Sequence, residues 1–342
     1  MPALSQYDHR WGVILAGGDG VRLKPLTRLA CGDNRPKQFC PLLGGKTLLA
    51  QTLDRISGTI AADRVVFALT RAHAAFYTAA LHPVPPVRKV VQPSNRGTLP
   101  AILWSLLRVS RLDPRAIVAL LPSDHYFADP QAFAAALEAA FAFAESGSGS
   151  VVLLGAAPAY PETEYGWIES DRDNRNSLGV AAVKRFWEKP APALAARLFA
   201  RGCVWNTFVM VGAADAFLAM MRRASPGFCK SMERLLLRPG GAAETEIRSL
   251  YSSLPVSDFS RQVLPANTGA LFVLDFGDIG WSDLGDPHRF LRALAAAGVQ
   301  IPSSLKTFCG ECAAGRSCRL RQPASESDRF DDASLALAVP CA

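Results

Sequence analysis

An apolar run that ends in a cluster of glycines is the feature that most limits what this 342-residue chain can fold into. Residues Trp11 to Ala16 have the composition of a short buried strand, and Gly17-Gly-Asp-Gly20 follows at once. In open parallel α/β sheets, ligands bind beyond the carboxyl ends of the strands, where a glycine turn lets backbone N–H groups approach phosphate oxygens. The pattern therefore predicts a strand that leads into a phosphate-binding turn. The alternative interpretation is a tight turn that binds nothing.

Strand and helix patterns alternate along the first half of the chain. Four more apolar runs predict strands over Arg64–Thr70, Val87–Val91, Ala116–Leu121 and Ser150–Gly155. Helical periodicity lies between them, over Thr47–Ser57, Ala72–Leu81, Thr98–Ser110 and Pro130–Glu145. This alternation predicts an α/β fold with an open, mainly parallel, Rossmann-like sheet and helices on both faces.

The rhythm changes after residue 150. Shorter strands are predicted over Tyr165–Ser170, Val180–Trp187 and Val204–Val211, as a small added β region over the active site. Later helices are predicted over Pro192–Ala200, Ala213–Arg223, Glu244–Ser252 and Pro287–Ala296, with a strand over Gly269–Asp275. We expect residues 1–300 to form one catalytic domain.

The last forty residues differ in composition from the rest. Residues 301–342 are rich in Ser, Pro, Arg, Asp and Cys with little periodicity, so we expect a cysteine-containing, largely disordered tail. Cys309, Cys312 and Cys318 have a spacing that zinc or an iron–sulfur cluster can use, and their role stays open.

The formal charge of +7 suits an anionic partner such as a nucleotide, a sugar phosphate or nucleic acid. The basic residues are scattered rather than clustered, so no nucleic-acid binding is expected. The first ten residues lack the apolar stretch of a secretion signal, and no long uncharged apolar run occurs. We therefore expect a cytoplasmic protein without membrane contact, and we allow for a homodimer.

Two common phosphate-binding motifs are absent. The pattern Gly-x-Gly-x-x-Gly fails because Gly18 and Gly20 are followed by Leu23 at the required position. The P-loop pattern fails because Gly44-Gly-Lys-Thr47 has Cys40 where its first glycine belongs. Neither a dinucleotide-binding fold nor a Walker ATPase is supported.

The continuation of the glycine loop carries a family resemblance. Gly17-Gly-Asp-Gly-Val-Arg-Leu-Lys-Pro-Leu-Thr27, followed by Arg35-Pro-Lys-Gln-Phe39, resembles the signature of the sugar-phosphate nucleotidyltransferases. Within that family, Pro36-Lys-Gln-Phe39 is most similar to the mannose-1-phosphate guanylyltransferase branch. Arg22 and Lys37 supply two cations near one glycine loop, as a triphosphate requires.

The resemblance continues over nearly all of residues 11–290. Six further segments fall in the family's order: Gln92-Pro-Ser-Asn-Arg-Gly-Thr-Leu-Pro-Ala-Ile102, Leu121-Pro-Ser-Asp-His125, Tyr165-Gly-Trp-Ile-Glu169, Phe186-Trp-Glu-Lys-Pro190, Trp205-Asn-Thr207 and Gly280-Trp-Ser-Asp-Leu-Gly285. Each segment alone is a weak signal, but their order and spacing together make a chance match very rare.

The resemblance implies a role for each matching residue. The implied catalytic cations are Arg22 and Lys37, and the implied nucleotide contacts are Leu15, Gly17, Gly18, Gly20, Gln92, Arg96 and Thr98. The implied sugar-phosphate contacts are Gly166, Glu169, Glu188, Lys189 and Asn206, and the implied Mg²⁺ ligands are Asp124 and Asp283. Carboxylates suit Mg²⁺, and nucleotidyl transfer needs charge neutralisation and in-line positioning more than a protein nucleophile.

The expected reaction transfers a nucleotidyl group from GTP to α-D-mannose 1-phosphate and gives GDP-mannose and pyrophosphate. Gln92 and Gly97 depart from the guanylyl pattern, which has Glu and Asn there, and thymidylyl-transferring relatives begin this segment with Gln-Pro. Trp205-Asn-Thr-Phe208 stands where Asn-Ser-Gly is usual, so Phe208 either narrows the sugar pocket or fills the core. The alternatives are a nucleotidyltransferase for another base and sugar, such as glucose-1-phosphate thymidylyltransferase, or a non-catalytic sugar-nucleotide sensor. We expect a single reaction, without the second catalytic module that bifunctional relatives carry.

Overall fold

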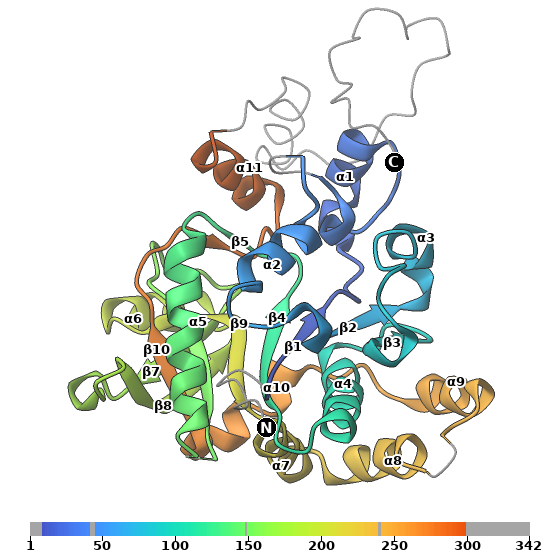
Figure 1. Cartoon of the computed structure of the whole chain (residues 1–342). Coiled ribbons are helices and arrows are strands. Elements are labelled where there is room, and N and C mark those ends of the chain that lie inside the picture. Colours follow the sequence, from blue (N-terminus) through green and yellow to red (C-terminus); the bar gives the residue numbers. More distant parts are fainter. Residues whose placement is uncertain (1–8, 42–44, 148, 239–240, 299–342) are drawn as a thin grey trace, which may run out of the picture.

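A nine-stranded sheet with helices packed on both faces forms the body of the protein in a computed structural model (Figure 1). The structure describes residues 9–41, 45–147, 149–238 and 241–298, so the predicted tail over residues 301–342 lies outside the described residues. Strand order in the sheet is β3-β2-β1-β4-β9-β6-β10-β8-β7.

The N-terminal half of the sheet is parallel, as predicted. It consists of β1 (Arg10–Leu15), β2 (Val65–Thr70), β3 (Lys89–Gln92) and β4 (Ile117–Pro122). Their register aligns Leu15 with Ala68 of β2 and with Pro122 of β4. The carboxyl ends of these strands therefore form one edge, and the loops that follow them meet there.

The C-terminal half of the sheet corrects the prediction of a mainly parallel arrangement. It contains β6 (Val151–Ala156), β7 (Gly166–Ser170), β8 (Val180–Glu188), β9 (Val204–Ala213) and β10 (Leu271–Asp275). Only β6 and β10 pair in parallel there, whereas β9 runs antiparallel to β4, β6 and β7. Hydrophobic periodicity reports that a strand is buried but carries no information on its direction, so the sequence did not reveal this reversal.

Strand β9 also prevents this half of the sheet from being open. On one edge its first residues, Val204 to Asn206, pair with β7, and its last residues, Met210 to Ala213, pair with β4. The ring β9-β6-β10-β8-β7 therefore closes on itself. Between the two halves of β9 the pairing with β6 shifts register, from Leu153 opposite Met210 to Gly155 opposite Asn206. This β-bulge lets one strand change its neighbour.

The helices confirm the α/β prediction with both faces of the sheet covered. On one face lie α4 (Thr98–Leu112), α7 (Ala214–Ala224), α8 (Pro226–Leu236) and α9 (Glu244–Ser253). On the other face lie α2 (Leu48–Ile56), α3 (Ala74–Tyr77), α5 (Pro130–Glu145) and α6 (Pro192–Ala200), and α5 runs across the front of the sheet in Figure 1. Strand residues alternate between the two cores: Val118 and Leu120 enter the first, and Ala119 and Leu121 the second.

A third, smaller core lies beyond the carboxyl ends of the strands. There α1 (Lys24–Cys31) packs against α11 (Pro287–Ala296) through Leu26, Phe290 and Leu294. A two-stranded ribbon of β5 (Tyr126–Phe127) and β11 (Trp281–Ser282) connects α11 to the loop after β4. Within the described residues, no helix has the length and apolarity needed to cross a bilayer.

Three hydrogen bonds, which we call the clasp, join the loop before α4 to the segment before α10 (Phe259–Gln262). Ser257 N donates to Arg96 O (2.9 Å), Leu99 N donates to Ser257 O (3.1 Å), and Phe259 N donates to Thr98 Oγ1 (2.8 Å). Gly97 lies inside this clasp at φ 88° and ψ −173°, a conformation that is nearly confined to glycine. A Cβ on Gly97 would lie 2.2 Å from Ser257 O. The asparagine of the guanylyl pattern therefore does not fit here.

We expect Gly97→Asn to destabilise the protein by at least about 2 kcal/mol, because the clasp must open to admit a Cβ. Urea unfolding followed by circular dichroism measures this change. Gly32→Asn is the matched control, since Gly32 also has a positive φ (76°, with ψ −3°) but nothing lies within 4 Å of its would-be Cβ. Equal stability of the two variants would contradict the explanation.

Candidate active site

A cavity of about 370 Å³ opens at the carboxyl ends of the parallel strands. Its floor is the aligned row of Leu15, Ala68 and Pro122. Gln92 of β3, which lies opposite Thr70 two residues farther along β2, also lines the cavity. A volume of this size is within the range of small-molecule sites. We call it the main cavity. A second hollow, lined by Gly20, Lys37 and Leu284 and called the side cavity, shares Arg22, Asp124, His125 and Asp283 with it.

The glycine loop forms one wall of the main cavity, as predicted from the sequence. Gly17 and Gly18 line the main cavity, and Gly20, at φ 55°, lines the side cavity. A Cβ on Gly17 would lie 2.8 Å from Thr70 Oγ1, so the close approach of loop and strand requires glycine. Gln38 supports the loop by donating from Nε2 to Ala16 O (3.1 Å) and Gly18 O (2.8 Å). A backbone held in this way can present N–H groups to phosphate oxygens.

The two predicted catalytic cations differ in their surroundings. Arg22 lies on the short 3₁₀ helix Val21–Leu23, half-exposed, and pairs with Glu164 at 3.0 Å. Lys37, on the 3₁₀ helix Lys37–Phe39, is buried. Its ammonium lies 3.2 Å from Asp124 Oδ2 and also donates to the backbone carbonyls of Asp283 and Leu284. Lys37 thus links the two segments that carry the predicted metal ligands.

Asp124 and Asp283 both line the two cavities. Burial on its own raises the pKa of Asp124, but the Lys37 ammonium, with smaller contributions from His125 and a backbone hydrogen bond, holds that pKa below its usual range. Asp283 Oδ1 accepts from Tyr165 Oη (3.0 Å) and Gly285 N (2.8 Å) and pairs with Arg289 Nε (3.1 Å). All three contacts converge on Oδ1, so Oδ2 is the oxygen that can meet a cation.

The carboxylates of Asp124 and Asp283 suit Mg²⁺ that binds together with phosphate. Within the described part of the chain, no three His, Cys, Asp or Glu side chains gather as a closed metal site. Mg²⁺ is commonly held by one or two carboxylates together with substrate phosphates and water. Two carboxylates beside a glycine loop match that arrangement.

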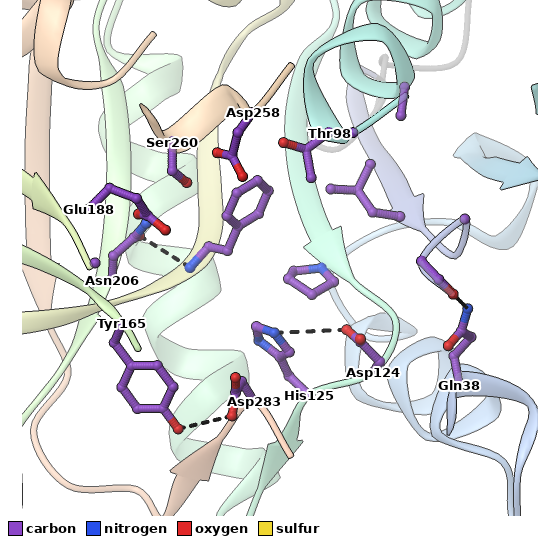
Figure 2. Close-up of a pocket in the computed structure, with 18 of the residues that line it drawn as sticks. Gln38, Thr98, Asp124, His125, Tyr165, Glu188, Asn206, Asp258, Ser260 and Asp283 are labelled. Carbon is purple, nitrogen blue, oxygen red and sulfur yellow. Dashed lines mark hydrogen bonds and ion pairs between the residues drawn. The ribbon is translucent and has the colours of Figure 1, made fainter. Parts of the chain in front are cut away.

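His125 belongs to the site although the sequence analysis gave it no role. It lines both cavities, Trp281 Nε1 donates to its Nδ1 (3.3 Å), and its Nε2 lies 3.8 Å from Asp124 Oδ1 (Figure 2). Because Trp281 donates to Nδ1, the neutral ring carries its proton on Nε2, facing Asp124. Burial lowers the pKa of His125, which favours this neutral form. The sequence signal that could have identified His125 was its place directly after Asp124, at the end of an apolar strand.

The far wall of the main cavity carries most of the predicted sugar-phosphate contacts. Gly166 of β7 lies opposite Glu188 of β8 and opposite Asn206 of β9, so the strand register brings these three residues together. Lys189 follows Glu188 into the same wall. A Cβ on Gly166 would lie 3.0 Å from Glu188 Oε2, which explains the need for glycine. Figure 2 shows Glu188 and Asn206 beside Asp258 and Ser260, which also line the cavity.

Two predicted contacts do not line either cavity. Glu169 lies three residues beyond Gly166 on β7, where alternation points its side chain to the opposite face, and its carboxylate pairs with Arg201. Arg96 turns away and donates from Nε to Tyr251 O (2.9 Å), so it holds the end of α9. The structure gives geometric support to neither contact. The remaining predicted residues, including Thr98, all line one of the two cavities.

Backbone strain is concentrated at this site. Among the described residues, three that are not glycine have a positive φ: Lys189 (50°), Phe208 (64°) and Leu284 (49°). Lys189 and Phe208 line the main cavity, and Leu284 lines the side cavity. Such strain is a known property of functional sites, where the surrounding structure enforces it.

Among the described carboxyl groups, Glu188 has the environment that most disfavours the charged form. Burial, followed by the nearby charge of Asp258, raises the pKa of Glu188 to about 7. A carboxyl group whose pKa is higher in the folded than in the unfolded protein stabilises the fold most at low pH. That contribution falls as pH rises from the ordinary value of 4.5 toward 7 and is absent above it.

We therefore expect Glu188→Gln to become more stable relative to the unchanged protein as pH rises. The gain between pH 5 and pH 8 should be roughly 1–3 kcal/mol, measured by urea unfolding at each pH. Glu244→Gln serves as a control without this trend between pH 5 and pH 8, because hydrogen bonds from Arg71 and Arg248 hold the pKa of Glu244 below its usual value, so that its charge changes only at lower pH. A stability difference for Glu188→Gln that does not vary with pH would contradict the assignment.

Known proteins are similar to this chain in sequence and in fold. Xanthan biosynthesis protein XanB of Xanthomonas campestris pv. campestris (strain B100) is 32% identical over 280 residues, which cover 80% of this chain and 57% of XanB. Mannose-1-phosphate guanylyltransferase of Escherichia coli (strain K12) is 29% identical over 286 residues, with the same coverage. A crystal structure described as mannose-1-phosphate geranyltransferase from Thermus thermophilus superposes with a TM-score of 0.72 at 32% identity, over 86% of this chain and 80% of that one.

The chain thus spans little more than half the length of the curated relatives that it matches. The match to the family described as Nucleotidyl transferase extends over residues 11–298, which contain the glycine loop, both cavities and every residue placed in them. This chain belongs to the nucleotidyl transferase family.

Proposed function

We propose that this chain transfers a nucleotidyl group from a nucleoside triphosphate to a sugar 1-phosphate. The preferred pair is GTP with α-D-mannose 1-phosphate, giving GDP-mannose and pyrophosphate. The observation that carries the proposal is one cavity with a glycine loop on one wall, Glu188, Lys189 and Asn206 on the other, and Asp124 and Asp283 between them. The names of the relatives from Escherichia coli and Thermus thermophilus support mannose 1-phosphate as the sugar substrate.

The triphosphate lies along the glycine loop in this proposal. Backbone N–H groups of the loop meet phosphate oxygens, Arg22 contacts them from the half-exposed rim, and Lys37 adds a buried positive charge. Asp124 and Asp283 would hold Mg²⁺, which supplies neutralisation of phosphate charge when it is bound.

The sugar phosphate binds against the opposite wall. Lys189 contacts its phosphate, while Glu188 and Asn206 accept from and donate to the hydroxyl groups. An oxygen of the sugar phosphate attacks the α-phosphorus, and the bond from that phosphorus to the bridging oxygen of pyrophosphate breaks. The side chains orient the two reactants and stabilise their charges, and none of them forms a covalent intermediate.

The base contact rests on Gln92, which is buried at the end of β3. One atom of its amide faces the backbone carbonyl of Leu69 at 3.4 Å, and because a carbonyl only accepts, that atom is the donor Nε2. Tyr251 Oη donates to the other atom, Oε1, at 3.3 Å. Nε2 lies toward Gly17, in the wall of the cavity. This amide donor favours a base with a carbonyl at C6 of a purine or C4 of a pyrimidine, as in guanine, thymine or uracil, over adenine or cytosine, which have an amino group at that position.

A pyrophosphate-release assay with Mg²⁺ tests the proposal, using GTP, dTTP, UTP, ATP and CTP, each with several hexose 1-phosphates. We expect GTP with mannose 1-phosphate to give the highest kcat/KM, and ATP and CTP to give the lowest. A higher value for dTTP with glucose 1-phosphate would support the thymidylyl alternative. Binding of GDP-mannose in calorimetry without turnover of any pair would overturn the enzymatic proposal in favour of a sensor.

We expect Asp283→Asn to lower kcat by at least about a hundredfold, because charge stabilisation by a bound metal is worth several kcal/mol. The fold should survive, since the amide oxygen still accepts from Tyr165 and Gly285. Steady-state kinetics and thermal unfolding measure the two effects.

Asp286→Asn is the matched control for this variant. Asp286 Oδ2 pairs with the same guanidinium, Arg289, at 2.7 Å, but Asp286 lines neither the main nor the side cavity. It begins α11 as the N-cap, a position that asparagine fills equally well. Comparable losses of turnover in both variants would mean that Asp283 acts through Arg289 rather than through a metal.

A further inference from the structure

Phe208 lies inside the β-bulge of β9, and its side chain lines the main cavity. Two hydrogen bonds shape the bulge. Phe208 N donates to Asn206 Oδ1 at 3.1 Å, and Thr207 Oγ1 donates to Leu154 O at 2.7 Å. The bulge therefore aims the residue at position 208 into the ligand site, as bulges next to active sites do.

The backbone at this position does not call for phenylalanine. At φ 64° a residue with a Cβ is strained, whereas glycine adopts this conformation freely. The bulge would close equally well around the glycine that usually stands at this point of the family's motif. Because the strain brings no benefit to the backbone, the benefit of Phe208 must come from its ring.

The ring is held in place and remains half-buried, not fully enclosed. It meets the ring of Phe259 edge to face, with centroids 6.4 Å apart. Phe259 is fixed in turn, since its N–H donates to Thr98 Oγ1 at 2.8 Å. The ring of Phe208 thus gives the cavity a rigid apolar surface. It lies in the same wall as the polar side chains of Glu188, Asn206, Asp258 and Ser260, which Figure 2 labels.

A pyranose matches this combination of surfaces. It has an apolar face of C–H groups and a rim of hydroxyl groups, so one aromatic surface beside several acceptors and donors can bind both. The ring also takes up space that glycine would leave open. We propose that Phe208 determines sugar specificity: its ring packs against the pyranose of the sugar 1-phosphate and excludes hexoses with a bulky substituent such as an acetamido group. This inference rests on the proposed function.

The test is Phe208→Gly, which removes the ring and relieves the backbone strain. We expect the KM for mannose 1-phosphate to rise about tenfold or more, with the KM for GTP changed less than about twofold. The kcat/KM for N-acetylglucosamine 1-phosphate, relative to mannose 1-phosphate, should increase about tenfold or more. Phe208→Leu keeps the bulk and the strain, so it should retain the exclusion while it weakens mannose 1-phosphate binding.

Thermal unfolding separates specificity from simple core filling. We expect Phe208→Gly to keep its Tm within about 5 °C of the unchanged protein, since relief of strain offsets lost packing. Phe199→Gly, on the exposed side of α6, controls for a general effect of losing an aromatic ring. Unchanged sugar KM and sugar ranking in Phe208→Gly, with a lowered Tm, would overturn the inference.

The failure of the proposed function would be seen separately, as absence of turnover in the unchanged protein. In that case calorimetric titration with GDP-mannose and with GDP-N-acetylglucosamine compares the unchanged protein with Phe208→Gly. Weaker binding of the first and a smaller difference between the two ligands would support the inference, and identical binding would refute it.

Discussion

Halfway along one edge of strand β9 the neighbouring strand changes from β7 to β4. This change of neighbour makes the two walls of the main cavity face each other. The last residues of β9 continue the sheet from β4, whose end carries Asp124, while its first residues pair with β7 and bring Asn206 beside Gly166. One continuous strand thereby fixes the far wall of the main cavity relative to the glycine loop. A transfer between two bound substrates depends on such fixed distances, because a small misplacement of the reacting atoms costs much of the rate.

The charged side chains at the junction of the two cavities each have a partner of opposite charge. Asp124 has Lys37, and Asp283 has Arg289, which also pairs with Glu162 and Asp286. Arg22 and Lys189 share Glu164, with Oε2 of that carboxylate 3.0 Å and 3.6 Å away. In the proposed function, a triphosphate and a sugar phosphate bring negative charge to both of these cations, so the substrates must compete with Glu164. Since exposed ion pairs are weak, the competition costs little free energy.

The sequence indicated the parts of the fold that depend on local pattern. The helices Pro192–Ala200 and Pro287–Ala296 have the predicted bounds, since each begins with proline in its first turn, and the parallel strands follow from their apolar runs. Strand direction and ring closure depend on contacts distant in sequence, so they were missed. The same limit applies to side chains: Glu169 was matched to a motif, but alternation along β7 turns it away from the cavity.

The departures from the family pattern are not equally informative. Gly97 is required by the approach of Ser257 O, to which a Cβ would come within 2.2 Å. Its presence in place of asparagine is therefore a consequence of local packing and carries no information on the base. Gln92 has no such steric explanation. In the proposed function its amide donor suits guanine and thymine equally, so the choice between these two bases depends on the rest of the base pocket. Phe208 differs from both: its backbone, at φ 64°, is strained for a residue other than glycine, and its side chain lines the cavity. A residue other than glycine, at a position whose backbone conformation favours glycine, indicates that the side chain itself has been selected for a function.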